Sequence, residues 1–332
     1  MVESNNISER WRVIINPTSG QGHGLTDFPK IAKLLRDHDI PCDAVFTEHK
    51  CHATELTVEA VRKGYRQIIV VGGDGTLNEV VNGLFIQKEV APHEIRLAVL
   101  AVGTGNDWVR TIGIPQHYSE AIRAICEGHT FLQDVGAVTY TESKYTQTRY
   151  LANVAGLGFD AYALALFNHY KMKGYNGKWL YLWSVLRAYF GYKPSGVRVE
   201  IDGQEVYNNL LLSMAIGICK FNGGGIQQLP NAVANDGLLD VTLIRPLHWW
   251  HIVFRAKRLF NGGIYSIGHV THAQGKQIKI TSSPDIALEC DGELMGNSPV
   301  EINIVPRAIR VVVTKEFLAY WSNLVHKIGA ID

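Results

Sequence analysis

The sequence predicts an α/β N-terminal domain with a mostly parallel sheet, followed by an all-β sandwich as the C-terminal domain. In the first 135 residues, short apolar strands alternate with helical segments, which is typical of a parallel sheet. Glycine-rich segments follow three of these strands. After Asp134, short strands with turn signals dominate, as in a sandwich. A chain of 332 residues can form two such domains, which we expect at residues 8–134 and 135–314.

The first domain should contain four strands, which are short apolar runs at residues 12–15, 43–47, 67–71 and 96–102. The third run is continuous and β-branched, as in a strand that is covered on both faces. Residues 28–38 have apolar residues at helical spacing, with Pro29 in the first turn, where proline is tolerated. A second helix should end at Gly64, a typical left-handed cap.

The second domain should consist of strands taken from seven apolar segments, at residues 149–156, 196–206, 208–218, 238–244, 276–282, 286–293 and 300–306. Beyond them, residues 315–328 have the pattern of an amphipathic helix that stops at Gly329. We expect this last helix to pack back on the first domain.

Charge is distributed unevenly along the chain. The net charge is only +1, so no global field favours nucleic acid, and we expect no nucleic-acid partner. Residues 161–199 and 241–284 nevertheless lack acids, and each stretch carries six lysines or arginines. Four of the seven tryptophans lie in these stretches, namely Trp179, Trp183, Trp249 and Trp250.

Aromatic and basic residues on one helix are typical of contact with a membrane interface. Anionic headgroups would also explain the absence of acids. Buried helices carry aromatic residues too, so core packing remains the alternative. We expect the two stretches to form one membrane-facing surface, and we name Trp249 and Arg255 as residues whose replacement would test it.

The five cysteines are scattered and never spaced as CxxC, which fits a reducing cytosol better than a disulfide framework or a zinc site. The N-terminus lacks the apolar core of a signal peptide. The longest mostly apolar run, residues 210–219, is about half the ~20 residues of a spanning helix. We therefore expect a cytoplasmic protein that can associate with the inner face of a membrane.

The glycine-rich segments at residues 16–20, 72–76 and 103–107 follow the first, third and fourth strands. Ligands of parallel sheets bind at the carboxyl ends of strands, and glycine lets a phosphate approach backbone N–H groups. Tight turns also favour glycine, which is the alternative for each loop alone. Neither a Walker A motif nor a GxGxxG motif is present.

The segment GGDGTLNEVVNG is the most specific of these loops. Thr76 is a candidate cap for a helix that begins at Leu77. A carboxylate at a phosphate-binding turn would repel the nucleotide unless a cation lay between them. Asp74 is therefore a candidate direct or water-mediated Mg²⁺ partner, with an Asx-turn as the alternative.

The segments NPTSG, GGDGTLNEVVNGL, AVGTGNDWVR, PNAVANDGLLDV and CDGE, in this order, resemble the diacylglycerol kinase catalytic-domain family, and most of all its soluble bacterial lipid kinases. GGDGT alone is shared with NAD kinases and, as GGDGS, with phosphofructokinases. The continuation into Leu-Asn-Glu, with GTGNDW and NDGLLD, is specific to the lipid kinases. The resemblance runs from about Trp11 to the C-terminal helix and implies a fold like that of NAD and diacylglycerol kinases.

The resemblance also implies an N-terminal nucleotide-binding domain, a C-terminal lipid-substrate domain, and ATP in the cleft between them. It places around the nucleotide the residues Asn16, Pro17, Thr18, Ser19, Gly20, Thr47, Gly72, Gly73, Asp74, Gly75, Thr76, Leu77, Asn78, Glu79, Thr104, Asn106 and Asp107. It implies a structural Mg²⁺ loop with Asp236 and the carbonyl groups of Val233 and Leu238 as ligands. Many relatives have an acid at the position of Asn235; the alternative is an ordinary Asp-Gly turn.

Glu293 aligns with the residue usually assigned as general base. A carboxylate within hydrogen-bond reach can take the proton of an attacking alcohol. Asp291 could instead be the base, with Glu293 orienting it or holding metal, and an exposed Asp-Gly turn is the alternative for both residues. Asp134 either assists this cluster or is a plain cap at the domain junction.

We therefore expect a lipid kinase that depends on ATP and Mg²⁺ and transfers the γ-phosphate to a lipid hydroxyl, with diacylglycerol as the default substrate. Its partners should be a nucleotide and a lipid at a membrane surface. Two alternatives remain: a kinase of a soluble alcohol such as NAD, and a non-catalytic peripheral membrane protein that binds nucleotide or lipid. The sequence does not determine the oligomeric state.

Overall fold

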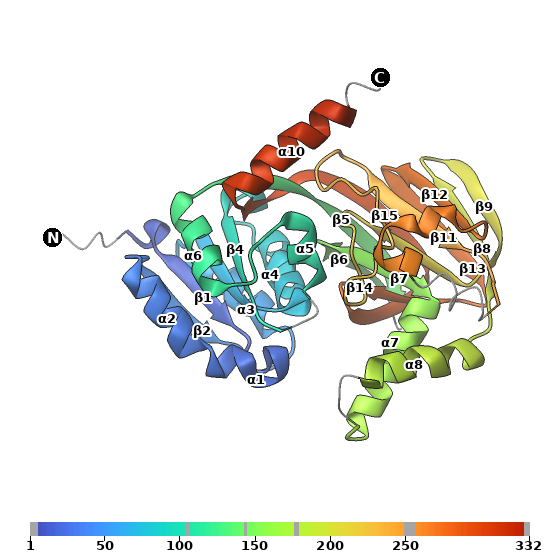
Figure 1. Ribbon diagram of the computed structural model, residues 1–332, viewed down its shortest axis with the longest axis horizontal. Helices are drawn as coiled ribbons and strands as arrows, with labels where there is room; N and C mark the ends of the chain where they lie inside the picture. The colour runs from blue at the N-terminus through green and yellow to red at the C-terminus, as the bar shows by residue number, and fades with distance from the viewer. Residues whose placement is uncertain (1–5, 104–105, 143–144, 176–178, 249–256, 329–332) are drawn as a thin grey trace. The chain divides into compact units, whose positions relative to one another are not determined.

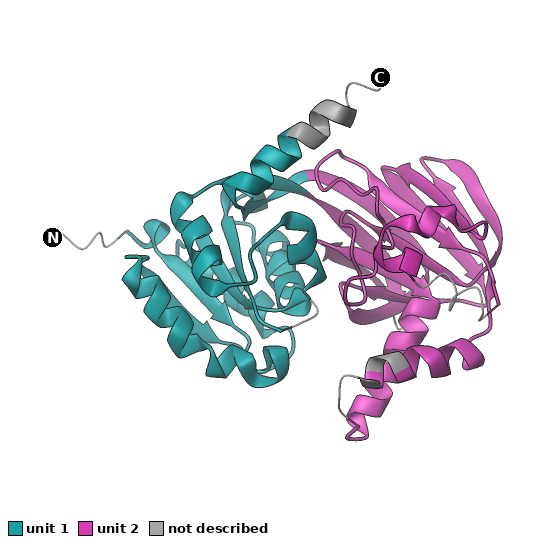
Figure 2. Cartoon of the chain, viewed as in Figure 1, with its two compact units in different colours: residues 1–133, 307–332 teal, residues 134–306 magenta. Residues whose placement is uncertain are grey.

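The structure is a computed structural model that describes residues 6–103, 106–142, 145–175, 179–248 and 257–328 (Figure 1). The chain forms two compact units, residues 1–133 with 307–332, and residues 134–306 (Figure 2). Two strands continue from one unit into the other, β5 (Thr130–Glu142) and β15 (Glu293–Val312). Because β15 passes the boundary at Arg307, residues 307–314, which we expected in the second domain, belong to the first unit.

The first unit contains a parallel sheet with the strand order β2-β1-β3-β4. Arg310 and Val311 of β15 add a parallel pairing to β4. The four expected strands are confirmed to within one residue at each end: β1 (Trp11–Ile15), β2 (Cys42–Phe46), β3 (Gln67–Gly72) and β4 (Arg96–Ala101).

Helices cover this sheet because their apolar stripes match its apolar faces. In α2 (Phe28–Asp37), Ile31 and Leu35 are buried in the cluster that contains Val13 and Ile15 of β1. The other helical segments of the unit, including short 3-10 turns (η), are η1 (Ile7–Glu9), α1 (Ser19–Thr26), α3 (His52–Arg62), α4 (Asp74–Ile86), η2 (Pro92–Glu94), α5 (Asp107–Ile112), α6 (Tyr118–Glu127) and α10 (Lys315–Ile328).

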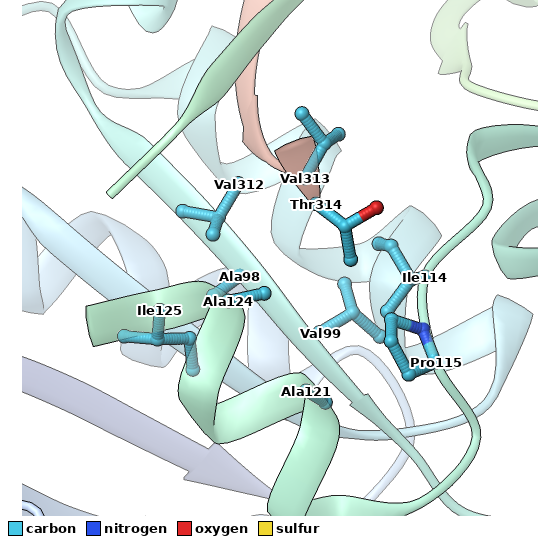
Figure 3. A pocket seen from close by; sticks show the side chains of 10 residues that line it. All are labelled: Ala98, Val99, Ile114, Pro115, Ala121, Ala124, Ile125, Val312, Val313 and Thr314. Carbon is cyan, nitrogen blue, oxygen red and sulfur yellow. The ribbon is translucent and has the colours of Figure 1, made fainter. Parts of the chain in front are cut away.

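The expected C-terminal helix is α10, and aromatic contacts hold it to the first unit. Phe317 and Trp321 are buried, and their rings lie edge-on to Phe131 with centroid distances of 5.3 Å and 5.0 Å. Before α10, the chain lines a small apolar cavity of about 10 Å³ with residues of β4 and α6 (Figure 3). That volume holds about one water molecule, so the cavity is a packing gap and no substrate site.

The second unit is built mainly of antiparallel strands. One run has the order β12-β11-β10-β7-β14-β15, and a second has the order β9-β8-β13-β15. Strands β5 and β6 form a hairpin. The remaining strands are β6 (Tyr145–Leu151), β7 (Val154–Gly158), β8 (Ser195–Ile201), β9 (Gln204–Leu211), β10 (Ser213–Gly217), β11 (Leu239–Ile244), β12 (Val270–Gly275), β13 (Gln277–Ser283) and β14 (Ala287–Cys290), with one 3-10 turn, η3 (Gly263–Ser266).

Two helices, α7 (Phe159–Met172) and α8 (Trp179–Gly191), interrupt the strands of this unit (Figure 1). They pack on each other, and α7 also contacts β7, β10 and β14. The sandwich architecture is confirmed, but the expectation of an all-β succession missed this insertion. Its sequence is apolar on nearly all sides, so no alternation of apolar and polar residues indicates the element. Among the described residues, no helix combines the length and apolar character needed to cross a membrane.

Candidate functional site

The structure brings the three glycine-rich loops together at the carboxyl ends of β1, β3 and β4. The Asn16 side-chain amide donates a hydrogen bond to Thr76 Oγ1 at 3.0 Å, which joins the first and second loops. Gly20 and Gly103, both with positive φ, join the first and third loops by close backbone contact. A Cβ on Gly20 would lie 3.0 Å from the Gly103 nitrogen, so these backbones approach too closely for a side chain.

Asp74 connects the second loop with the third. Its carboxylate accepts the backbone N–H groups of Asp107 at 2.9 Å and of Trp108 at 3.3 Å, at the start of α5. The predicted role of Thr76 as a helix cap is wrong, because α4 begins at Asp74 after Gly73 and has no side-chain cap. Thr76 is buried and accepts the bond from Asn16 instead.

The residues that follow Asp74 lie inside the first unit. Leu77, Asn78 and Glu79 are all buried. The Glu79 carboxylate accepts the backbone N–H groups of Cys51 at 2.9 Å and of Ala53 at 3.1 Å, at the start of α3. Glu79 therefore fixes the segment that follows β2, and any influence on a ligand would act through that segment.

Other predicted residues border the same loops. Thr47 follows β2, and its N–H donates to the Ile15 carbonyl at 2.8 Å. The Asn106 side-chain amide donates to the Gly103 carbonyl at 3.0 Å. Asn16 Oδ1 accepts from the N–H and the hydroxyl of Thr18, at 3.1 Å and 2.9 Å, and so shapes the first loop. Thr104 lies outside the described residues.

A second group of candidate residues lies in the second unit, around the turn between β14 and β15. Asp291 is 7% exposed, and its carboxylate accepts three backbone N–H groups, from Ala152, Asn153 and Val154, at 3.0 to 3.1 Å. Its own N–H donates to the Val154 carbonyl. The Asp291 carboxylate thus holds the bend between β6 and β7.

Glu293 has a different environment. Its side chain is 17% exposed, and Arg149 of β6 donates to its Oε2 at 3.0 Å. The carboxylate is thereby oriented by a guanidinium. Arg149 is a residue that sequence reasoning missed, because 144 positions separate it from Glu293 and only the register of the strands brings the two together.

Asp134 and Asp236 meet at the predicted metal loop. Asp134 is fully buried; its Oδ2 accepts the Gly237 N–H at 2.7 Å, and its own N–H donates to the Ala234 carbonyl. Asp236 Oδ1 accepts the Leu238 N–H at 3.0 Å. Desolvation, with smaller contributions from Asp240 and Asp134, raises the pKa of Asp236 to about 6. A carboxylate beside two other acids is compatible with a Mg²⁺ ligand at Asp236.

A further group of side chains could meet a metal ion, and the sequence interpretation did not identify it. Among the described residues, His49, His52 and Glu55 at the start of α3 place ligand atoms within 4.8 Å of one another. His49 and Glu55 are exposed, and His52 Nδ1 is engaged with the Glu48 N–H at 2.9 Å. The arrangement lies on the protein surface.

Comparison with known proteins identifies both units. Residues 10–138 match the diacylglycerol kinase catalytic domain, and residues 153–313 match the YegS C-terminal NAD kinase beta sandwich-like domain. The chain is 28% identical over 311 residues to a diacylglycerol kinase of Bacillus subtilis, covering 93% of this chain and 97% of the relative. It is 29% identical over 313 residues to one of Staphylococcus aureus, covering 93% and 94%.

Solved structures show the same fold. A diacylglycerol kinase structure from Bacillus anthracis is 23% identical, with a TM-score of 0.68 and coverage of 93% of this chain and 98% of the other. Yeast NADH kinase is 12% identical, with a TM-score of 0.54 and coverage of 96% and 87%. The matched domains and the curated relatives place the chain in the lipid kinase class of enzymes. The chain belongs to the diacylglycerol kinase catalytic-domain family.

Proposed function

We propose that the protein transfers the γ-phosphate of ATP to the hydroxyl group of a membrane lipid in a Mg²⁺-dependent reaction, with diacylglycerol as the default acceptor. The observation that carries phosphoryl transfer in this proposal is the convergence of three glycine loops at one edge of the parallel sheet, whereas the choice of a lipid acceptor rests on the second unit. Gly20 and Gly103 pack backbone against backbone, so the first and third loops meet without side chains between them, and glycine-rich loops at strand ends are suited to bind phosphate.

The first unit would hold the nucleotide. Residues 16–20, 72–76, Asn106 and Asp107 would surround the phosphates, and Thr47 would lie near the nucleotide. Thr104, which is outside the described residues, remains a candidate from the sequence. Asp74 is the candidate Mg²⁺ partner in this group, and its bonds to Asp107 and Trp108 fix the direction of its carboxylate. Bound Mg²⁺ would neutralise charge on the phosphate oxygens.

The second unit would supply the base. As the lipid oxygen attacks the γ-phosphorus, its proton goes to Glu293, and the bond between the γ-phosphorus and the bridging oxygen of ADP breaks. Glu293 suits this role better than Asp291 does. Three backbone N–H groups occupy the Asp291 carboxylate, whereas the Glu293 carboxylate is partly exposed and oriented by Arg149.

Lipid access would depend on α8. Trp183, Leu186 and Phe190 repeat at helical spacing along one face, with exposed fractions of 56%, 52% and 66%. Arg187 on the same helix is also exposed. Apolar side chains beside bases, in a stretch without acids, suit an anionic bilayer surface. Arg198 does not contribute, because it pairs with Glu200 and Glu205.

The second acid-free stretch contacts the first, because β13 pairs with β8 and a further hydrogen bond comes from α8. The Tyr189 hydroxyl on α8 donates to the Leu247 carbonyl at 2.8 Å. Lys257, Arg258 and Phe260 are exposed, whereas Trp249, Trp250 and Arg255 lie outside the described residues. The bond between Tyr189 and Leu247 supports one common bilayer-facing surface for the two stretches.

An unbiased acceptor screen tests the proposal. The purified protein is incubated with γ-labelled ATP, Mg²⁺ and a total lipid extract, and in parallel with a water-soluble metabolite extract. We expect label in a phospholipid, which chromatography and mass spectrometry then identify. Label only in the soluble extract would indicate an alcohol such as NAD, and no label in either would indicate a binding protein without turnover.

A further inference from the structure

Asp160 and Glu289 lie close together beside the Asp291–Glu293 turn. No step of the proposed mechanism uses these two acidic side chains. Glu289 on β14 is 3% exposed and pairs in register with Gly156 of β7. Asp160 lies in the first turn of α7, directly after β7. A Cβ on Gly156 would lie 2.6 Å from Glu289 Oε1 and 3.0 Å from the Asp160 Cβ. Glycine at this position therefore leaves room for both carboxyl groups.

Hydrogen bonds connect the pair to the turn. Glu289 Oε2 accepts the Gly292 N–H at 2.9 Å. The Asn222 amide donates to Glu289 Oε1 at 3.4 Å and to Gln228 Oε1 at 3.0 Å. The Gln228 amide then donates to Asp160 Oδ2 at 2.8 Å. A continuous network thus runs from the turn to α7, and its two linking side chains are neutral.

The charge balance of the pair is unusual. Among the described residues, no ion pair involves Asp160 or Glu289. Two neighbouring carboxylates cannot both ionise without a cost when one of them is buried, as Glu289 is. Burial, together with the charge of Asp160, raises the pKa of Glu289 to about 8, and burial also raises that of Asp160. The other titratable groups around the pair are Tyr192, Cys290, Asp291 and the Arg149–Glu293 ion pair.

The turn at Asp291 and Gly292 has a backbone conformation that contacts with neighbouring residues must stabilise. Asp291 and Gly292 have φ of +50° and +83°, so two consecutive residues adopt the left-handed region, which is unfavourable for the aspartate. The Asp291 carboxylate fixes one side of the turn through the bend between β6 and β7. Glu289 fixes the other side through the Gly292 N–H.

Building on the proposed function, we propose that Glu289 is a positioning residue that acts as a neutral carboxylic acid beside Asp160 and fixes the turn that carries Glu293. Ionisation of Glu289 would place two negative charges across Gly156 and push the side chains apart. The Gly292 N–H would then lose its hydrogen bond to Glu289, and the Glu293 carboxylate would move away from Arg149.

Kinetics of Glu289→Gln as a function of pH test this proposal. The amide is neutral like the acid, and its oxygen can keep the Gly292 N–H at the expense of the long 3.4 Å contact with Asn222, so kcat at pH 7 should stay near the wild-type value. Wild-type kcat should fall by about tenfold near pH 9, where about one Glu289 in ten keeps its proton, and the variant should not show this fall. KM for ATP should be unchanged, because the candidate phosphate loops belong to the other unit. Asp285→Asn, at an exposed acid just before β14, should keep the wild-type profile.

Two outcomes overturn the proposal. If Glu289→Gln lowers kcat at every pH, the residue works as a carboxylate. If the alkaline fall persists in the variant, another group titrates. Activity of the wild type on lipid is needed for this test, so its absence would count against the proposed function itself.

Thermal unfolding separates the two questions, because it needs no substrate. The folded-state pKa of Glu289 lies above the ordinary value of 4.5, so its stabilising contribution is complete below pH 4.5 and is lost as pH rises toward about 8. The Tm of the wild type should therefore fall relative to that of Glu289→Gln between pH 5 and pH 9. A constant difference in Tm would overturn the neutral state of Glu289 whatever the enzyme phosphorylates.

Discussion

Asp291 and Glu293 stand on either side of a glycine, yet the structure uses their carboxylates for different purposes. Asp291 accepts three backbone N–H groups and is nearly inaccessible, whereas Glu293 is partly exposed and paired with Arg149. The sequence left open which of the two residues is the base. At the residue scale, their different environments predict that replacing Asp291 lowers stability and that replacing Glu293 lowers the catalytic rate.

Glu293→Gln should lower kcat by at least ~10²-fold, the contribution of a general base, while Tm and ATP affinity stay close to wild type. Asp291→Asn should instead lower the free energy of unfolding by about 2 kcal/mol, because the amide cannot accept all three N–H groups. Steady-state kinetics and thermal unfolding of both variants provide the comparison. A catalytic defect confined to Asp291→Asn would reverse the two assignments.

Asp74 allows a second contrast of this kind. Its carboxylate supports the start of α5, so Asp74→Ala should cost about 1 kcal/mol of stability, as for loss of a helix cap. Asp74→Asn keeps one acceptor and should cost less. Both variants should lose turnover if the negative charge partners Mg²⁺. Full activity of Asp74→Asn in an assay with titrated Mg²⁺ would leave Asp74 with a structural role only.

At the element scale, α8 is the segment whose surface contradicts simple core packing. Trp183, Leu186 and Phe190 are more than half exposed on one face, while Ser184 and Ala188 are buried on another. Small residues of the helix are therefore buried while these three large apolar side chains lie at the surface, which is the arrangement expected of an element that contacts a bilayer.

The double variant Trp183→Ala, Phe190→Ala should bind anionic vesicles more weakly than the wild type in co-sedimentation assays. Wild-type binding should also weaken with salt, because each base near an anionic surface contributes about 1 kcal/mol that salt screens. Tyr320→Ala on α10 is the matched control, since Tyr320 is an aromatic residue with a similar exposed fraction, 58%. If binding does not depend on vesicle charge or salt and is unchanged in the double variant, the exposed face of α8 does not bind the bilayer.

Sequence reasoning succeeded for elements whose signal is local. The run Ile68–Ile69–Val70–Val71 predicted a buried strand, and the apolar spacing in residues 315–328 predicted α10. Both predictions depend only on the hydrophobic pattern of neighbouring residues. It missed what depends on distant partners. The contacts of Asp74 with α5, of Glu79 with α3 and of Glu293 with Arg149 span 26 to 144 positions, and no local pattern encodes them.

At the scale of the whole molecule, the chain carries two separate sets of candidate residues, one on each unit. The loops of the first unit suit phosphate, and the turn between β14 and β15 in the second unit suits proton transfer. NAD kinases share the fold and the GGDGT segment, so neither feature alone selects the acceptor. The distinguishing features belong to the second unit: the partly exposed Glu293 and the exposed apolar face of α8.

A competition assay tests the central claim most directly. The enzyme receives γ-labelled ATP and Mg²⁺ together with equal amounts of diacylglycerol in mixed micelles and NAD in the aqueous phase, with Glu293→Gln as the inactive control. We predict that the label enters the lipid phase as phosphatidic acid, that NAD remains unlabelled, and that chelation of Mg²⁺ stops the transfer. Label recovered as NADP, with none in the lipid, would contradict the assignment of a lipid hydroxyl as the acceptor.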